Sequence, residues 1–167
     1  MRYGLMTNVR RSWSKVGDRA ILPHQQAFEN RYLFSAVSPL TGKDFHLMGI
    51  DEMDTAAEFV FLTELKKQHP DQHVIVVWDN APCHRPRVLH GIPGLTLIHL
   101  PSYSPELNPA ERFFEEIRRA TANKVFKSIK QQETLITTTV NQWSSNKDAL
   151  KQLLGYAWIR EQCGVVS

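Results

Sequence analysis

The pattern of apolar and polar residues predicts two paired strands in the first third of the chain. Residues 31–37 and 45–50 are rich in strand-forming residues, and the turn signals Ser38-Pro39 and Thr41-Gly42 separate them. These two segments are therefore expected to form a hairpin. Residues 1–7 are short and half apolar, which is typical of the outgoing end of another strand.

The apolar spacing changes to a helical period after this hairpin. Phe59, Leu62 and Leu65 recur at helical spacing and predict a helix capped by Asp54 or Thr55. Residues 73–78 form a continuous apolar run, typical of a strand buried on both faces. The later segments are a short helical stretch near 85–90, a strand at 95–100, and helices at 109–126, 129–143 and 148–154. This order predicts an α/β fold, a mixed sheet flanked by helices, in a single domain spanning residues 1–167.

Composition narrows the class of protein. The 167 residues suffice for one domain with its own core, and 42% apolar with 22% charged residues is typical of a globular chain. A net charge of +3 permits a nucleic-acid partner without arguing for one. Cys83 and Cys163 stand far apart and lack a partner motif, which favours a reducing, cytoplasmic setting. No apolar run approaches the roughly 20 residues of a membrane span, so no membrane partner is expected.

Two acidic residues stand where catalytic carboxylates are often found. Asp79 ends the apolar run 74–78, and ligand sites of α/β sheets gather at the carboxyl ends of strands. The alternative is that Asp79-Asn80 forms only an Asx-type turn. Glu111 closes Asn108-Pro109-Ala110-Glu111, which has the form of a helix capping box. In the first helical turn its carboxylate would stay ionised, and ionised carboxylates are the ligands that Mg²⁺ prefers.

The segments around these two residues carry a more specific pattern. One reads Asp-Asn-Ala-Pro-Cys-His at 79–84, and the other reads Leu-Pro-Ser-Tyr-Ser-Pro-Glu-Leu-Asn-Pro-Ala-Glu at 100–111. Both resemble signature blocks of the DDE transposases of the mariner-like superfamily, in particular its bacterial insertion-sequence branch. The resemblance extends upstream through Arg10-Arg11-Ser12-Trp13 and covers nearly the whole chain.

The resemblance implies a ribonuclease-H-like fold and two-metal phosphoryl transfer on DNA. Asp79 and Glu111 would be the second and third catalytic acids and would bind Mg²⁺ or Mn²⁺. The implied partners are DNA, as transposon ends and target, and either a second copy of the chain or a full-length transposase. His84 matches a histidine of the family and could support the site, although a loop or packing role fits it as well.

The resemblance also implies a first catalytic aspartate on the first strand, just before a stretch like Arg2-Tyr3-Gly4-Leu5. It is therefore expected at or before Met1, and an upstream reading frame would be one source of it. Asp51-Glu52 is an acidic pair, but its position after a strand and before a helix favours a turn. The helix-turn-helix region by which the family recognises transposon ends is likewise expected to lie outside residues 1–167.

Two functions follow from that pattern. The first is a transposase catalytic fragment for metal-dependent DNA strand cleavage and transfer, inactive alone because the first aspartate is missing. The second is a noncatalytic regulator that binds DNA or a full-length transposase. Several basic residues could contact DNA phosphates or could form a solvated helix face, and the sequence leaves both open: Arg112, Arg118, Arg119, Lys124, Lys127 and Lys130.

Overall fold

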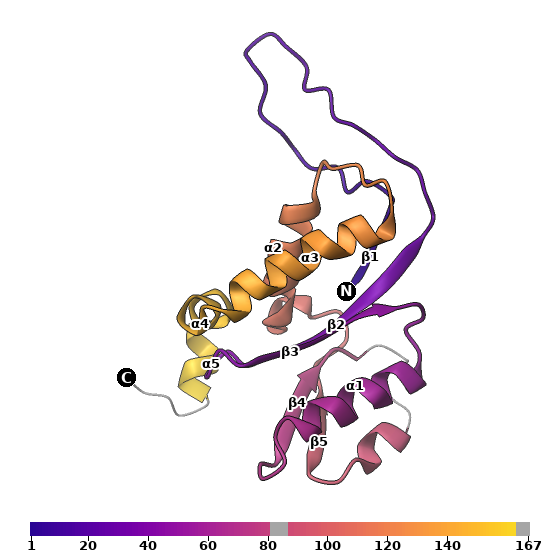
Figure 1. Cartoon of the computed structure of the whole chain (residues 1–167). Coiled ribbons are helices and arrows are strands. Elements are labelled where there is room, and N and C mark those ends of the chain that lie inside the picture. The colour runs from indigo at the N-terminus through magenta and orange to yellow at the C-terminus, as the bar shows by residue number, and fades with distance from the viewer. Residues whose placement is uncertain (81–86, 163–167) are drawn as a thin grey trace.

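The computed structural model describes residues 1–80 and 87–162, and its chain runs through strands and helices in the predicted order (Figure 1). The strands are β1 (Arg2–Gly4), β2 (Asn30–Val37), β3 (Asp44–Ile50), β4 (Val74–Trp78) and β5 (Leu95–His99). The α-helices are α1 (Thr55–Lys67), α2 (Ala110–Thr121), α3 (Ile129–Ser144), α4 (Lys147–Leu154) and α5 (Ala157–Gln162). Two short 3₁₀ segments, η2 (Arg87–Gly91) and η3 (Pro105–Leu107), complete the described elements.

The strands form two sheets within the described ranges. β2 pairs antiparallel with β3 from Tyr32↔Ile50 to Val37↔Asp44, which confirms the predicted hairpin. β1 adds to the other edge of β2, also antiparallel. β4 and β5 form a separate parallel pair. The sequence predicts a single mixed sheet, whereas no ladder joins β4 to the three-stranded sheet among these residues.

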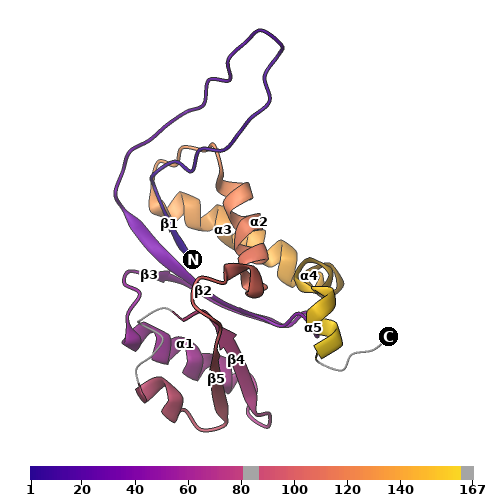
Figure 2. The same ribbon diagram turned by 180° about the vertical axis from the view of Figure 1, so that it is seen from behind.

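The β2–β3 hairpin lies between two cores because its side chains alternate between its faces. Leu33 and Met48 face a core shared with α2, α3 and α4, whereas Phe34 and Leu47 face a core shared with α1 and β4–β5. Figure 2 shows the two halves of the molecule on opposite sides of the long hairpin. Helices thus cover both faces of the central hairpin, and the predicted α/β fold class is confirmed.

The prediction that β4 is buried on both faces is wrong. Val74 and Val76 contribute to the core under α1, but Ile75 is 60% and Val77 49% exposed. Ile98 of β5 is 48% exposed on the same pair of strands. An unbroken apolar run does not distinguish one covered face from two, and the described helices cover only one face of this pair.

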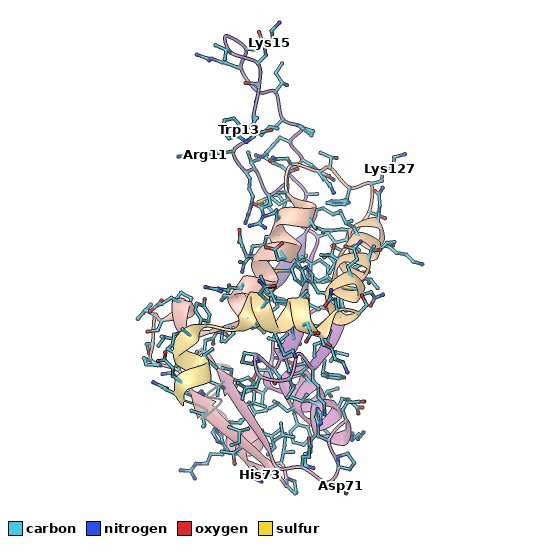
Figure 3. The ribbon with its side chains drawn as sticks, turned by 90° about the vertical axis from the view of Figure 1, so that its left-hand side faces the viewer. Arg11, Trp13, Lys15, Asp71, His73 and Lys127 are labelled. Carbon is cyan, nitrogen blue, oxygen red and sulfur yellow. The ribbon has the colours of Figure 1, made fainter. Side chains whose placement is uncertain are left out.

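A long loop between β1 and β2 projects away from both cores (Figures 1 and 3). Its two ends are joined by backbone hydrogen bonds, from Leu5 to Glu29 over 3.0 Å and from Thr7 to Gln25 over 3.1 Å. Further out, Trp13 is fully exposed. We call residues 8–24 the arm.

Helix ends are fixed by short polar side chains. Asp54 caps α1 by accepting a hydrogen bond from the Ala57 amide over 2.8 Å, which settles the choice between Asp54 and Thr55. Ser128 and Asn146 cap α3 and α4 in the same way. Throughout residues 1–80 and 87–162, every helix is too short or too polar to cross a lipid bilayer.

Candidate active site

Asp79 follows directly on the last residue of β4. The carbonyl of Trp78 accepts a hydrogen bond from the Leu100 amide over 2.8 Å, so the chain leaves β5 beside the end of β4. One residue on, Asn80 Nδ2 donates to Ser102 Oγ over 3.2 Å. These contacts place the start of the segment 100–111 next to Asp79, which links the two motifs that the sequence separates.

Glu111 lies in the first turn of α2. Phe113 and Ile117 of this helix are completely buried, and Glu111 lies beside this buried stripe with its side chain 38% exposed. Asn108 Oδ1 accepts from the Ala110 amide over 3.1 Å, but the Glu111 side chain does not return to Asn108. The predicted capping box is therefore only half formed, because the Glu111 carboxylate bonds to an arginine instead.

That arginine is Arg118, two turns further along α2. Its Nη2 donates to Glu111 Oε2 over 2.9 Å, and its Nη1 lies 3.4 Å from Glu115 Oε2. Glu115 in turn accepts both guanidinium donors of Arg10, at 2.5 and 3.0 Å. The hydrogen bonds from Arg10, reinforced by Arg118, lower the pKa of Glu115 to about 2. A chain of four charges therefore connects the base of the arm to Glu111.

This chain of ion pairs is not predicted by the sequence pattern, in which Arg118 is one of several basic residues. The only local signal is the separation of seven residues between Glu111 and Arg118, which places two side chains of a helix on the same face. Arg10 comes from a segment 105 residues distant from its partner Glu115, and no local pattern predicts such a contact.

The start of β1 lies near both predicted catalytic acids. The Met1 amino group donates to the Leu33 carbonyl over 2.6 Å, and burial lowers its pKa to about 6. The carboxylates of Glu111 and Asp79 act against this shift, and the Arg118 charge acts with it. Asp79 and Glu111 come from distant parts of the chain, yet both act electrostatically on this one amino group.

Other predicted or considered residues lie elsewhere. Asp51 is paired with Arg31 at 3.1 Å with its side chain 79% exposed, as expected of a turn residue. Among the residues that the structure describes, no three histidine, cysteine, aspartate or glutamate side chains converge as a metal site would require. His84 and Cys83 lie outside the described residues.

Comparison with known proteins identifies the family. The sequence profile of the DDE superfamily endonucleases matches residues 1–136. An uncharacterized protein, y4pE/y4sA of Sinorhizobium fredii (strain NBRC 101917 / NGR234), is 31% identical over 119 residues, which is 70% of this chain and 85% of that protein.

Solved structures with a similar fold are complexes of the Mos1 transposase. The strand transfer complex has a TM-score of 0.66 at 16% identity and covers 92% of this chain and 48% of the other. A paired-end complex with the left transposon end has a TM-score of 0.61 at 15% identity, covering 93% and 53%. A paired-end complex with Mn has a TM-score of 0.57 at 17% identity, covering 94% and 54%.

The chain thus spans about half the length of the transposase chains that it resembles. At this level of identity the likeness shows a shared fold, and it confirms the predicted ribonuclease-H-like α/β architecture. The profile match covers well over half of the chain, and the chain belongs to the DDE superfamily endonuclease family.

Proposed function

We propose that the chain is the catalytic domain of a DNA transposase, and that Asp79 and Glu111 are two of its metal-binding carboxylates. One observation carries the assignment: the Leu100–Trp78 and Asn80–Ser102 hydrogen bonds place the start of the segment that ends at Glu111 beside Asp79, at the end of β4. In an α/β fold such a meeting point at strand ends is a common position for a ligand site.

The donor set fits Mg²⁺ or Mn²⁺. Both side chains offer hard oxygen ligands, and Mg²⁺ is often bound by one or two carboxylates together with substrate phosphates. Glu111 uses Oε2 for Arg118, which leaves Oε1 for a cation. A bound ion would supply Lewis-acid polarisation of the phosphate and an activated water or hydroxyl nucleophile. Asp79 and Glu111 would hold it, while the Arg118 guanidinium fixes the Glu111 side chain.

DNA is the proposed substrate, as transposon end and as target. The Mos1 structures of the same fold are complexes of paired ends and of strand transfer, which supports this substrate class. Assembly with a second copy or with a full-length transposase is part of the same proposal, as is function in the cytoplasm. The domain would span residues 1–167.

We further propose that residues 1–167 alone do not cleave DNA. The described residues bring two carboxylates to the site, and Asp51 is engaged with Arg31.

Incubation of the purified chain with Mn²⁺ and labelled transposon-end DNA tests this directly. We expect weak Mn²⁺ binding, measured by electron paramagnetic resonance of the free ion, that Asp79→Asn and Glu111→Gln each abolish. We also expect no cleavage. Robust cleavage that disappears in Asp79→Ala would contradict the inactivity and still support the transposase assignment. Mn²⁺ binding that survives both substitutions would contradict the site itself.

A second candidate function is that of a noncatalytic regulator that occupies DNA or pairs with a complete transposase. The exposed apolar side chains of the arm favour this second function, because surfaces of this kind usually meet a partner. Co-purification with a full-length homologue would support it, and a monomer without affinity for DNA or for the homologue would exclude it.

A further inference from the structure

We propose that Arg112 is the residue of this site that binds a backbone phosphate of the DNA. The inference rests on the proposed function and deepens it, because it selects one residue from the basic set that the sequence leaves undivided. It follows from how the charges beside Glu111 are paired.

A hollow of about 520 Å³ opens beside Glu111 between α2 and the chain around α4 and α5. Its charged lining consists of three arginines and four glutamates, namely Arg112, Arg118, Arg119, Glu106, Glu111, Glu115 and Glu116, so a phosphate would be attracted only at an arginine that no glutamate pairs with. Each arginine carries a positive charge that could attract a phosphate, so the question is which of these charges remains uncompensated.

Two of the three charges are already engaged by carboxylates on the same helix. Arg118 bonds to Glu111 over 2.9 Å, and Arg119 Nη1 lies 2.6 Å from Glu116 Oε1. A phosphate that recruited either guanidinium would have to compete with a carboxylate for the same donors. This competition reduces the gain from each new contact.

Arg112 is held by neutral groups instead. Its guanidinium carbon lies 3.7 Å from the centre of the Tyr156 ring, and its Nη1 donates to the Leu153 carbonyl over 3.2 Å. Among the described residues no carboxylate lies within ion-pair distance of Arg112. The charge is therefore fixed in position without being neutralised.

This arrangement suits recognition of a phosphodiester. A guanidinium stacked on an aromatic ring keeps its remaining N–H donors in a rigid plane, and these donors match phosphate oxygens in pairs. Because the ring and the carbonyl already restrain the side chain, binding would cost little additional rotamer entropy. Arg112 and Glu111 line the same hollow, so a phosphate bound there would lie near the proposed metal.

The test measures binding of a fluorescent duplex DNA to the full chain as a function of salt, without metal. We expect Arg112→Gln to weaken binding roughly tenfold, as loss of a charged hydrogen bond would. The slope of the logarithm of the binding constant against the logarithm of the salt concentration should become less steep by about 0.9, the value for one phosphate contact. The matched control Arg119→Gln removes an arginine of the same hollow and should change the affinity less than about twofold.

Two further variants keep the test decisive if Arg112→Gln does not fold. Arg112→Lys retains the charge but not the planar donors, so we expect the salt dependence to persist while the affinity falls. Tyr156→Leu removes the ring beneath the guanidinium and should weaken binding in the same direction. Thermal unfolding of each variant shows whether it is folded.

Equal effects of Arg112→Gln and Arg119→Gln would overturn the assignment, and so would a wild-type chain without DNA affinity. Mn²⁺ binding at Glu111 is measured separately on the same variants. If Mn²⁺ binding requires Asp79 and Glu111 while DNA binding ignores Arg112, only the Arg112 inference fails. If Mn²⁺ binding ignores both acids, the proposed function fails as well.

Discussion

Arg118 and Glu111 form an ion pair across two turns of α2, with 2.9 Å between Nη2 and Oε2. The guanidinium compensates a carboxylate that we assign to metal binding, so it acts as a cation already present in the site. A dication that approached Glu111 would meet the charge of Arg118, and the two would repel each other.

Arg118→Gln is therefore expected to tighten Mn²⁺ binding. The single positive charge of a guanidinium and the double charge of Mn²⁺, separated by about 6 Å in water, repel each other by about 1.4 kcal/mol. This energy corresponds to about a tenfold change in affinity. Loss of side-chain order at Glu111 would oppose this gain by a smaller amount, since the carboxylate is already partly exposed. Mn²⁺ titration followed by electron paramagnetic resonance measures the change, with Arg119→Gln as control. Weaker binding in Arg118→Gln would mean that ordering of Glu111 outweighs the repulsion.

The Arg10–Glu115 ion pair should make the stability of the fold depend on pH under acidic conditions. Because Arg10 lowers the pKa of Glu115 to about 2, the pair stabilises the fold above the ordinary glutamate pKa of 4.5. This contribution is lost as the pH falls from about 4.5 toward 2. Arg10→Gln should raise the pKa of Glu115 toward its ordinary value and flatten that part of the stability profile. Both side chains are partly exposed, so solvent screening keeps the effect modest.

A carboxyl NMR titration of Glu115 in the wild-type chain and in Arg10→Gln measures this shift. Lys67→Gln, which removes an exposed pair with Glu64, serves as control and should leave the titration of Glu115 unchanged. An unaltered pKa of Glu115 in Arg10→Gln would show that the contact at the base of the arm does not persist in solution.

The ring of His46 should make the stability of the fold depend on pH near neutrality as well. Its ring is bonded to Ser35 and Asp44 and stacks on Phe113 with 5.0 Å between ring centres. Burial lowers the pKa of His46 below its ordinary value of 6.5, although Asp44 acts in the opposite direction. Protonation is therefore disfavoured in the folded chain, and stability should fall as the pH drops below 6.5 through the lower folded pKa.

Urea unfolding at pH 7 and at pH 5 tests this prediction. The wild-type chain should lose stability between these values, and His46→Gln should lose less because it carries no titrating ring. His69→Gln, just after the end of α1, serves as the comparison and should lose as much stability between pH 7 and pH 5 as the wild-type chain. If His46→Gln loses as much stability between pH 7 and pH 5 as the wild-type chain, the pH dependence belongs to other groups.

Gly42 is expected to resist substitution. Its φ of +66° lies in the left-handed region, and a Cβ atom there would stand 2.3 Å from the Lys147 carbonyl oxygen of α4. Gly42→Ala should therefore destabilise the fold by about 1–3 kcal/mol, since the turn and α4 would have to separate. Gly91→Ala adds a Cβ with nothing within 4 Å and should change stability by less than about 0.5 kcal/mol. Denaturant unfolding of both variants measures the difference, and equal stabilities would contradict the close approach.

Local patterns predict most of the elements and both acidic residues. The β2–β3 hairpin follows from two strand-forming runs around Thr41-Gly42, and the start of α1 follows from Asp54. In contrast, α2 ends at Thr121, five residues before the predicted end at 126. Asp79 and Glu111 could be selected because distinctive segments surround them. Their metal-binding role stays a prediction.

Features that depend on distant contacts could not be predicted in the same way. The outer face of β4 is open because coverage of a strand is decided by other elements, which Ile75 and Val77 do not specify. The Glu111–Arg118 bond depends on which rotamers two long side chains adopt, and the capping box was an equally good local solution. Arg10 reaches Glu115 only because the base of the loop lies beside α2, while the rest of the loop projects away.

The projecting arm has a practical consequence for work with this protein. Both ends of the loop are tied together by the Leu5–Glu29 and Thr7–Gln25 bonds, so the arm's outer residues carry little of the folding energy. New chain ends or an inserted tag at Gly17 should therefore leave the two cores intact, and a dye attached there would report on events at the arm without disturbing Glu111.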